Sequence, residues 1–595
     1  MLLEAAPASL ETALERVDAI ADRTFGEWTV PGLVYGVVAD GRLAHVRGLG
    51  TLRVGEAATP DGDSVFRIAS MTKSFTAATV LSLRDEGRLR LDDPIAMHLP
   101  QLAGLRGPTA DSPPITIRHL LTMTAGFPTD DPWGDRQQGL DPGAFLDLVA
   151  AGLSFAWTPG TRWEYSNLGY GLLGRIITAV DGREYKDAVR ARILEPLGLT
   201  STGYLEDEVP PDRKALGYVW RDDRFLAEPM DRYGALAAMG GVFTSVRDLG
   251  TWVGGFIDAW PPRDEPEAAH PLSRASRREM QQPLMSFDPG VTFRDADADP
   301  ELDGGAYGFG LFIQEHLRWG RIVGHSGGYP GFGSNMRWHP ASGLGVIALA
   351  NGRYAPSSLL AQQLLVAVLD AETVPVRRVR ANAATEAAAA AVEALLDRWD
   401  DAVAADLFAM NVELDEPVER RRAFAEQLRS IHGRLVPDPA EPVVSRSAFH
   451  RQWWLRGDRG RVRVEILLTP QLPPKVQTLT LTSVPEPPPA LQAAAERIAA
   501  ALAVADGAAP SWPAELAISQ TLDPAVLARS LRAAEARFGK LRLGPAIAGD
   551  GVRAATFRLE CHRGQLELVL ERDPDTGGLT KVRLKPARLA AADFD

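Results

Sequence analysis

A serine and a lysine three residues apart carry the strongest chemical signal in the sequence. Ser70 and Lys73 stand in the run Ser-Met-Thr-Lys, at the start of a predicted amphipathic helix over residues 70–86. Side chains at positions i and i+3 of a helix share one face, so the hydroxyl and the amine can meet. A serine hydroxyl becomes a good nucleophile when a neighbouring base takes its proton, and burial lowers the pKa of a lysine toward that task. The pair predicts covalent catalysis on Ser70, although Ser-x-x-Lys is common by chance.

Two further motifs carry groups that such a reaction needs. Tyr165 and Asn167 stand in Tyr-Ser-Asn, directly before a predicted helix over residues 168–180. A phenol beside a lysine can pass a proton to a leaving group, whereas a buried aromatic and a helix N-cap are the structural alternatives for these two residues. The third motif is His-Ser-Gly-Gly at residues 325–328, at the end of a predicted strand. Its glycines let the backbone approach a substrate closely, although alone it is a glycine-rich turn.

In this order, the three motifs resemble those of the serine β-lactamase and penicillin-recognising hydrolase family. Because the middle motif is Tyr-x-Asn, the resemblance is to class C β-lactamases and their D-aminopeptidase and carboxylesterase relatives. It extends from about Glu15 to Asp370 and includes the run Phe-Arg-Ile-Ala-Ser that ends at Ser70. The resemblance implies an α/β (α+β) fold, in which helices flank an antiparallel sheet and a helical domain adjoins it.

The resemblance also implies a role for each motif residue. Ser70 is the nucleophile that becomes acylated, while Lys73 and Tyr165 share its proton and Tyr165 later activates water. The backbone N–H groups of Ser70 and Gly328 form the oxyanion hole, and Asn167 hydrogen-bonds the substrate's amide or Lys73. The residues that line the substrate site from the neighbouring strand are His325, Ser326 and Gly327.

One departure from the family pattern bears on the substrate. β-Lactamases and penicillin-binding proteins usually have Lys-Thr-Gly at the third motif, where this chain has His-Ser-Gly at residues 325–327. A lysine there offers a permanent cation to the carboxylate of a penicillin, whereas a histidine is mostly neutral at pH 7. The difference favours the esterase or aminopeptidase branch, in which His-x-Gly is familiar.

An acidic loop follows the Thr-Ala-Gly turn at residues 124–126. The resemblance places this loop near the site, where Asp130, together with Asp131 and Asp135, can hold the ammonium group of a D-aminopeptidase substrate. The alternative is a solvated loop that caps a helix. No group of His, Asp and Glu has the spacing of metal ligands, so we expect neither a metal nor another cofactor.

The elements that carry these motifs predict one α/β sandwich over residues 1–372. Asp40-Gly41 between two apolar runs is a strong two-residue hairpin signal, and an amphipathic helix between Leu10 and Ala21 opens the chain. Further helices are predicted at 70–86, 142–152, 168–180 and 185–194, and late strands at 307–314, 321–325, 334–339 and 345–351. Strands at both ends with helices between them indicate that the two ends share a sheet.

The remaining chain is predicted to hold a linker, 373–386, and two related modules, 387–486 and 487–595. The chain repeats itself there with a period of about 104–106 residues. Each copy has two helices followed by two alternating strands; the helices cover 388–399 and 417–431 in one copy, and 491–502 and 524–538 in the other. We interpret each copy as a helical hairpin packed on an antiparallel sheet, with a role in specificity or in a homo-oligomer.

Composition narrows the class of protein further. The chain has 595 residues, 45% of them hydrophobic, and a net charge of −13, which excludes a disordered protein and argues against nucleic acid or an acidic membrane as a partner. Its single cysteine excludes an intramolecular disulfide. No run of about 20 apolar residues predicts a transmembrane helix. The N-terminus lacks the pattern of a secretory signal, so we expect a cytoplasmic location.

We therefore expect a metal-independent serine hydrolase that acylates Ser70 and acts on a small ester, amide or peptide. Alternatives on the same site are a D-aminopeptidase, a β-lactam hydrolase, and a transpeptidase or cyclase in which an amine replaces water. A ligand-binding sensor or scaffold without activity is a different class of protein. The intact set Ser70, Lys73, Tyr165 and Asn167 argues against it.

Overall fold

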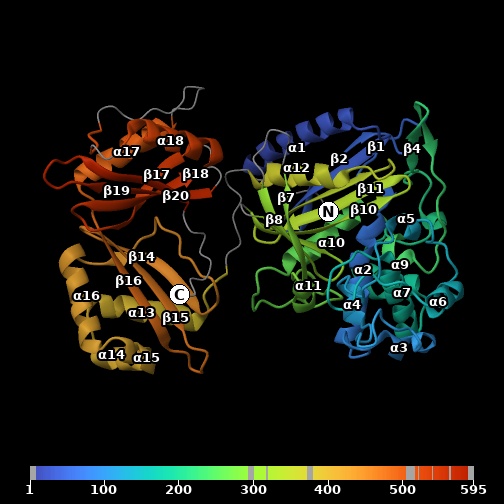
Figure 1. The fold of residues 1–595 in the computed structure, drawn as a ribbon, viewed down its shortest axis with the longest axis horizontal. Coiled ribbons are helices and arrows are strands. Elements are labelled where there is room, and N and C mark those ends of the chain that lie inside the picture. The colour runs from blue at the N-terminus through green and yellow to red at the C-terminus, as the bar shows by residue number, and fades with distance from the viewer. Residues whose placement is uncertain are drawn as a thin grey trace. The chain divides into compact units, whose positions relative to one another are not determined.

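The computed structural model describes residues 8–292, 301–316, 319–370, 379–503, 516–519, 522–538, 541–561 and 564–586. The chain divides into two compact units, Met1–Arg377 and Arg378–Asp595 (Figure 1). Each unit has its own sheets and its own hydrophobic core. We describe the two units one at a time.

The first unit is built on an eight-stranded antiparallel sheet. Its strands are β1 (Gly32–Ala39), β2 (Arg42–Gly50), β7 (Met285–Thr292), β8 (Glu301–Tyr307), β9 (Phe312–His316), β10 (Gly320–Tyr329), β11 (Phe332–His339) and β12 (Leu344–Ala350). Their order across the sheet is β2-β1-β12-β11-β10-β9-β8-β7. Strand β1 pairs with β12, and Leu33 lies opposite Ala350. This pairing confirms the prediction that the two ends of the segment share a sheet.

The turn between β1 and β2 has the conformation that its sequence predicts. Asp40 and Gly41 have φ angles of 47° and 77°, so both lie in the left-handed region. Two-residue hairpins of this type follow the right-handed twist of the strands, and Asp-Gly tolerates the positive φ angles.

Helices cover both faces of the sheet near β1. Helices α1 (Ala8–Glu27) and α12 (Ser357–Leu369) pack together over one face, as Figure 1 shows, and helix α10 (Val246–Asp258) packs on β1, β11 and β12. Alternate residues of a strand point to opposite faces. Accordingly, Leu33 belongs to the core beneath α1 and α12, whereas its neighbour Val34 belongs to the other core.

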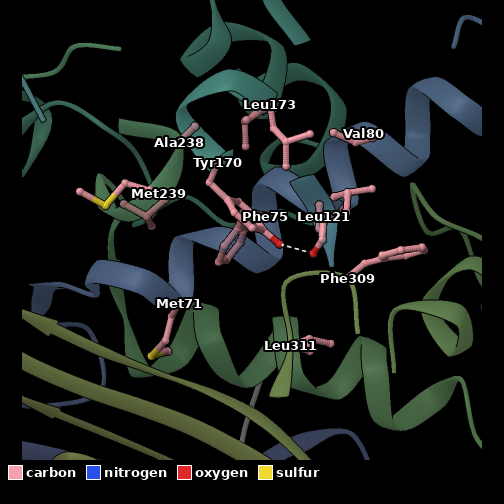
Figure 2. Packing of buried hydrophobic residues seen from close by; sticks show 14 of the residues in the cluster. Met71, Phe75, Val80, Leu121, Tyr170, Leu173, Ala238, Met239, Phe309 and Leu311 are labelled. Carbon is pink, nitrogen blue, oxygen red and sulfur yellow. Dashed lines mark hydrogen bonds between the residues drawn. The ribbon is translucent and has the colours of Figure 1, made fainter. Parts of the chain in front are cut away.

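Helix α2 (Thr72–Asp85) runs through the centre of the helical part of the first unit. All its residues from Thr72 to Leu83 are buried, which is the pattern of a helix surrounded by neighbours. Helices α7 (Asn167–Asp181) and α9 (Ala237–Gly240) pack against it. Figure 2 shows this packing, in which the Tyr170 hydroxyl of α7 also donates a hydrogen bond to the Leu121 carbonyl at 3.0 Å. The packing holds the start of α2 in a fixed place.

The shorter elements of the first unit connect these parts. They are α3 (Ile95–His98), α4 (Ile117–Leu121), α5 (Asp131–Gly134), α6 (Pro142–Ala150), α8 (Tyr185–Val189), α11 (Arg274–Met280), β3 (Val65–Arg67), β4 (Tyr218–Arg221), β5 (Arg224–Ala227) and β6 (Phe243–Ser245). The helix predicted over 185–194 is α8 followed by a π-helical turn at Arg190–Leu194.

The prediction of one strand over residues 307–314 is wrong. Strand β8 ends at Tyr307 and strand β9 begins at Phe312, with a turn between them. Gly310 in this turn has a φ of 70°, and a Cβ atom there would lie 2.6 Å from the Lys73 carbonyl oxygen. The chain therefore turns here because it meets the backbone of α2, and only glycine fits both the angle and the approach.

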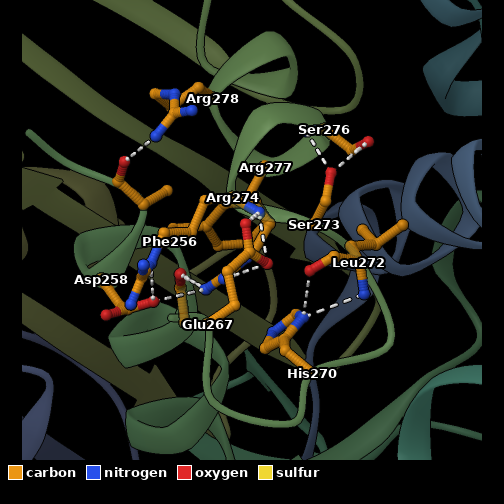
Figure 3. Close-up of polar contacts among 12 residues, drawn as sticks. Phe256, Asp258, Glu267, His270, Leu272, Ser273, Arg274, Ser276, Arg277 and Arg278 are labelled. Atoms are coloured by element: carbon orange, nitrogen blue, oxygen red, sulfur yellow. Dashed lines mark hydrogen bonds and ion pairs between the residues drawn. The ribbon is translucent and has the colours of Figure 1, made fainter. Parts of the chain in front are cut away.

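A polar cluster joins α10 to α11 (Figure 3). The Asp258 carboxylate, at the end of α10, accepts hydrogen bonds at 3.2 Å from both Arg274 Nε and Arg277 Nη1. Both arginines are buried and lie on α11. Arg263 also pairs with Asp258. The carboxylate thus holds the loop between the two helices.

The second unit contains two modules, and in each of them the described helices precede the strands. The first has helices α13 (Ala383–Asp397), α14 (Asp401–Leu407), α15 (Met410–Asp415) and α16 (Val418–His432) and strands β13 (Val436–Pro437), β14 (His450–Gly457), β15 (Gly460–Leu468) and β16 (Val476–Pro485). The second has helices α17 (Pro489–Ala503) and α18 (Pro524–Phe538) and strands β17 (Leu541–Gly549), β18 (Ala554–Cys561), β19 (Gly564–Arg572) and β20 (Leu579–Pro586). Each forms a four-stranded antiparallel sheet, where the sequence predicted only two strands.

The start of the second unit differs from the predicted linker. Residues 371–378 lie outside the described part of the chain, but α13 already begins at Ala383, inside the segment predicted as 373–386. The Asn382 side chain caps this helix by accepting the Thr385 N–H at 2.8 Å.

Candidate active site

Ser70 lies in a strained turn between strand β3 and helix α2. The turn is a single 3-10 stretch, Ala69–Met71, and Ala69 has a φ of 48°, which is rare for a residue with a side chain. Strand β10 passes directly over this turn, because a Cβ at Gly327 would lie 2.2 Å from the Ile68 carbonyl oxygen. Backbone strain of this kind is held in place by the surrounding packing and is concentrated at functional sites.

Lys73 lies one helical turn beyond Ser70 and is fully buried, with none of its surface exposed. Its Nζ donates to Ser70 Oγ at 2.8 Å, to Asn167 Oδ1 at 2.7 Å and to the Met239 carbonyl at 2.9 Å. Burial lowers the pKa of Lys73 to about 8, against the opposing field of nearby aspartates. About a tenth of the amine is therefore neutral at pH 7 and able to accept the proton of Ser70.

Tyr165 lies beside the same two groups. Its ring centroid is 4.8 Å from Lys73 Nζ, and its phenol is a hydrogen-bond partner of the Ser70 hydroxyl. Burial and the charge of Asp131 raise the pKa of Tyr165 well above 10. The phenol therefore keeps its proton at neutral pH, which suits it to donate a proton and leaves Lys73 as the candidate base.

Asn167 is the first residue of helix α7 and is not its N-cap. Ser166 takes that place and accepts the Gly169 N–H at 3.3 Å. The Asn167 side chain instead accepts from Lys73 through Oδ1 and donates to Asp131 Oδ1 at 2.6 Å through Nδ2. Asn167 thus orients the lysine, which is one of the two roles that the sequence suggested for it.

The aspartates of the acidic loop have two different roles. Asp130 accepts the backbone N–H groups of Asn167 at 2.7 Å and Leu168 at 2.8 Å, so its carboxylate caps helix α7. The carboxylates that line the cavity at Ser70 are those of Asp131 and Asp135. The structure therefore places Asp130 in the capping role, which was the structural alternative, and not on the cavity wall. Burial raises the pKa of Asp135 to about 6.

His325 lies in strand β10 with only 2% of its surface exposed. Its Nδ1 is 2.6 Å from the Ser326 carbonyl, which can only accept, so Nδ1 carries the proton. The Tyr307 hydroxyl then donates to Nε2 at 3.0 Å. Burial and the charge of Lys73 lower the pKa of His325 to about 3. The imidazole is therefore neutral. It packs against Phe312 of strand β9 with ring centroids 4.9 Å apart, which adds a side-chain contact between β9 and β10.

A cavity of about 630 Å³ opens at Ser70. Its lining residues are Ser70, Asp131, Pro132, Asp135, Arg136, Trp163, Tyr165, Phe312, Ser326, Gly328, Arg353 and Tyr354. The structure thus brings together four predicted site residues from three distant segments: Ser70, Tyr165, Ser326 and Gly328. The predicted site residues that are not part of the cavity lining are Lys73, Asn167, His325, Gly327 and Asp130.

The cavity also includes residues that the sequence did not single out. Trp163 stands two positions before Tyr165, a spacing that puts both side chains on one side of an extended chain and was available as a signal. Arg353 and Tyr354 follow strand β12, whose position beside β1 and β11 is a tertiary feature. No sequence pattern indicated that Arg353 and Tyr354 line the cavity.

Two broader features of the described residues bear on the class of protein. They contain no group of three or more His, Cys, Asp or Glu side chains that could hold a metal ion. None of their helices combines the length and the hydropathy needed to cross a bilayer.

A serine on a strained turn, a buried lysine, a tyrosine and a facing sheet strand define the serine-nucleophile class of the β-lactamase fold. Comparison with known proteins agrees, because a model of the beta-lactamase family matches residues 17–370, more than half of the chain. The chain belongs to this family, which confirms the resemblance and the predicted fold class.

The chain is similar to named relatives over part of its length. It is 30% identical over 259 residues to the D-alanyl-D-alanine-carboxypeptidase/endopeptidase AmpH of Escherichia coli strain K12, covering 42% of this chain and 63% of that protein. It is 26% identical over 348 residues to protein flp of Staphylococcus aureus strain COL, covering 58% of this chain and 64% of that protein. The chain thus spans a little less than two thirds of both relatives.

A solved structure is similar over nearly the whole chain. It is that of the octameric penicillin-binding protein homologue from Pyrococcus abyssi, with a TM-score of 0.52 and 19% identity. The match covers 97% of this chain and 98% of the other. At this level of identity the similarity concerns the fold.

Proposed function

We propose that the protein is a serine hydrolase that forms an acyl-enzyme on Ser70 and hydrolyses esters or small amides. The observation that carries the proposal is the placement of Lys73: fully buried, with its Nζ 2.8 Å from Ser70 Oγ and a pKa lowered to about 8. A base must lie within hydrogen-bond reach of the proton that it takes, and its pKa must be near the working pH.

The reaction begins when neutral Lys73 takes the Ser70 proton and Oγ attacks the carbonyl carbon of the substrate. The negative charge that develops on the carbonyl oxygen is stabilised by the N–H groups of Ser70 and Gly328, where one lost donor typically costs about 10²–10³ in rate. As the intermediate collapses, the Tyr165 hydroxyl gives its proton to the leaving oxygen or nitrogen and regains one from Lys73. Water then attacks the acyl-enzyme, loses a proton to the same pair, and Ser70 leaves with a proton restored.

The substrate class follows from the third motif. A neutral His325 bonded to Ser326 and Tyr307 leaves the third motif without the cation that β-lactamases and penicillin-binding proteins have there. We therefore place esters and small amides first. The cavity carboxylates Asp131 and Asp135 favour a D-aminopeptidase as the second candidate, because they can pair with a substrate ammonium group.

Other reactions use the same acyl-enzyme. A β-lactam hydrolase or a D-alanyl-D-alanine peptidase, the activity in the name of AmpH, needs the same nucleophile and base. A transpeptidase or cyclase needs an amine in place of water. A sensor or scaffold without turnover is opposed by the complete set of polar contacts around Lys73.

The first test is covalent labelling followed by turnover. A fluorophosphonate should add one adduct to Ser70, seen by intact mass and peptide mapping, and p-nitrophenyl butyrate should be hydrolysed. Ser70→Ala should abolish both, and Tyr165→Phe should lower turnover by about 10²–10⁴ with unchanged circular dichroism. An unlabelled protein that turns over no ester, D-aminoacyl amide or β-lactam contradicts the hydrolase.

The same substrates separate the candidates. If D-alanine p-nitroanilide is cleaved and the butyrate ester is inert, the D-aminopeptidase replaces the esterase. If nitrocefin is the best substrate, the β-lactam hydrolase does. Product formation that depends on an added amine identifies the acyl transferase.

We also propose a homo-oligomer assembled through the C-terminal modules. The support is the similarity in fold, over nearly the full chain, to a homologue that is octameric. The cytoplasmic location stays a prediction from the sequence.

A further inference from the structure

The cavity at Ser70 has an aromatic part and a charged part. The aromatic part is formed by Trp163, Tyr165 and Phe312, whose ring centroids lie 6.2–6.4 Å apart. The charged part holds Arg136, which follows α5, and Arg353, which follows β12. Among the described residues that line the cavity, these two arginines are the cationic side chains.

One carboxylate holds both arginines side by side. Arg136 Nη2 is 3.5 Å from Glu228 Oε2, and Arg353 Nη1 is 3.4 Å from Glu228 Oε1. The Glu228 side chain is only 7% exposed, whereas those of Arg136 and Arg353 are 43% and 35% exposed. The buried Glu228 carboxylate thus lies next to both arginines, whereas the guanidinium groups of Arg136 and Arg353 are partly exposed and line the cavity.

This group carries a net positive charge, because two guanidinium groups share one carboxylate. Each guanidinium has five N–H donors, and the nitrogen nearest to Glu228 is 3.5 Å away in Arg136 and 3.4 Å away in Arg353. The separations also exceed those of a good N–H···O hydrogen bond, about 2.7–3.2 Å. Donors are therefore left for an acceptor that enters the cavity.

The acidic residues of the cavity are placed differently. Asp131 accepts from Asn167 Nδ2 at 2.6 Å, and Asp135 accepts from the Tyr354 hydroxyl at 2.8 Å. Their oxygens are thus partly satisfied by donors from the protein itself. A negative group in the cavity meets partly exposed guanidinium donors at the arginines, whereas a positive group competes with Asn167 and Tyr354 for the carboxylates.

We propose that Arg136 and Arg353 form an anion subsite that holds a carboxylate of the substrate. The inference rests on the proposed function and specifies the substrate class: an ester or small amide that bears a carboxylate away from the reacting bond. The cation that the third motif lacks is then supplied from two loops at the cavity wall. Bidentate pairing suits this task, since a guanidinium matches the geometry of a carboxylate.

The test compares substrates that differ in one charge. One pair is 3-butyryloxybenzoate and its neutral amide, with the charge on the leaving group; the other is p-nitrophenyl hydrogen adipate and p-nitrophenyl hexanoate, with the charge on the acyl group. We expect a higher kcat/KM for the anionic member of at least one pair, and a preference that declines as salt is added. Arg353→Gln and Arg136→Gln should each lower kcat/KM for that member about tenfold or more, through KM, and change the neutral member less than twofold.

Arg353→Lys separates charge from geometry and should retain part of the preference. Arg221→Gln, an exposed arginine on β4 that is not part of the cavity lining, is the matched control and should change neither substrate. Equal losses on both members of a pair mean that the arginines only tie two loops together, and the subsite is then rejected. It is also rejected if wild type does not distinguish the members of either pair.

A binding measurement separates this inference from the hydrolase itself. Ser70→Ala protein is titrated by calorimetry with 3-butyryloxybenzoate and with its amide, with and without Arg353→Gln. Tighter binding of the benzoate that is lost with Arg353→Gln supports the subsite even if wild type turns over nothing. Equal binding of both compounds contradicts it even if neutral esters are good substrates.

Discussion

At the scale of single residues, the chemistry depends on a lysine that has three oxygen partners and no solvent. The Lys73 amine donates hydrogen bonds to Ser70 Oγ, Asn167 Oδ1 and the Met239 carbonyl, and burial lowers the pKa of Lys73 to about 8. The pKa of the neighbouring Tyr165 is shifted in the opposite direction, well above 10, because burial and the negative charge of Asp131 both disfavour the phenolate. In the proposed reaction, the two pKa shifts suit Lys73 to the role of base and Tyr165 to the role of proton donor.

The lysine predicts the pH dependence of the rate. In the proposed reaction the base is neutral Lys73, and protonation removes it, so we expect activity to be lost as the pH falls through about 8 and to be fully present above it. We expect kcat/KM for a neutral ester to rise about tenfold per unit below pH 7 and to level off above pH 8. Stopped-flow rates between pH 5.5 and 9.5 measure this.

Two variants control that profile. Lys73→Arg keeps a charge that is not lost in this range and should remove most activity at every pH. Asp135→Asn removes the carboxyl whose pKa is raised to about 6 and one of the charges that raise the pKa of Lys73, so the limb should remain but move to slightly lower pH. A wild-type rate that stays flat from pH 6 to 9 would show that Lys73 is not the base.

At the scale of elements, the site depends on close approaches of backbone. Strand β10 reaches the Ser70 turn at Gly327, and the β8–β9 turn reaches the Lys73 carbonyl at Gly310. Asp130 fixes the start of α7, from which Asn167 extends to Lys73. Each contact ties one element to the start of α2. The nucleophile and its base are thereby held by three separate parts of the fold.

The Asp258 cluster in Figure 3 gives a prediction about stability at this scale. Asp258→Ala removes the carboxylate shared by Arg274 and Arg277, which are both buried on α11. We expect a loss of about 2 kcal/mol in the unfolding free energy of the first unit, because buried guanidinium groups lose a charged partner. Urea unfolding followed by tryptophan fluorescence measures it.

An exposed pair provides the control. Asp187 pairs with Lys186 at 2.9 Å with both side chains partly exposed, so Asp187→Ala should cost less than about 1 kcal/mol. If the two variants unfold at the same urea concentration, the cluster contributes no more than a surface ion pair.

At the scale of the whole molecule, the catalytic residues and the repeats belong to different units. Every residue that lines the cavity lies between Ser70 and Tyr354, inside the first unit, and the family match also ends at residue 370. The second unit is a pair of modules, and buried Glu441 of the first module forms an ion pair at 3.0 Å with Arg558 of the second. Glu441 also pairs at 2.9 Å with Arg461 of its own module. The chemistry and the proposed assembly can therefore be separated by experiment.

We predict that residues 1–378 fold and hydrolyse a small ester with a kcat/KM within about threefold of the full chain. The reason is that the site and its supporting core are complete in this unit. Size-exclusion chromatography with light scattering should show that the full chain forms an oligomer and the shortened chain does not. An oligomer that persists in the shortened chain contradicts the role proposed for the modules, and an inactive but folded one shows that they complete the site.

The sequence alone determined the parts of this protein that depend on local spacing. Ser70 and Lys73 meet because helical geometry brings residues three apart together, and Asp40-Gly41 makes a hairpin because it accepts positive φ angles. Helices α13, α16, α17 and α18 of the two modules were predictable from apolar periodicity, whereas α14, α15 and half of each sheet were not predicted.

Only the tertiary structure determined which side chains from distant segments contact one another. It turned Asp130 toward a helix N-terminus and His325 toward Tyr307, and it split the strand predicted over 307–314 where Gly310 meets α2. It also placed Arg136 and Arg353 on one carboxylate at the cavity wall. Local pattern sets which conformations a segment can adopt, but a side chain's partner and its pKa depend on what packs against it from elsewhere in the chain.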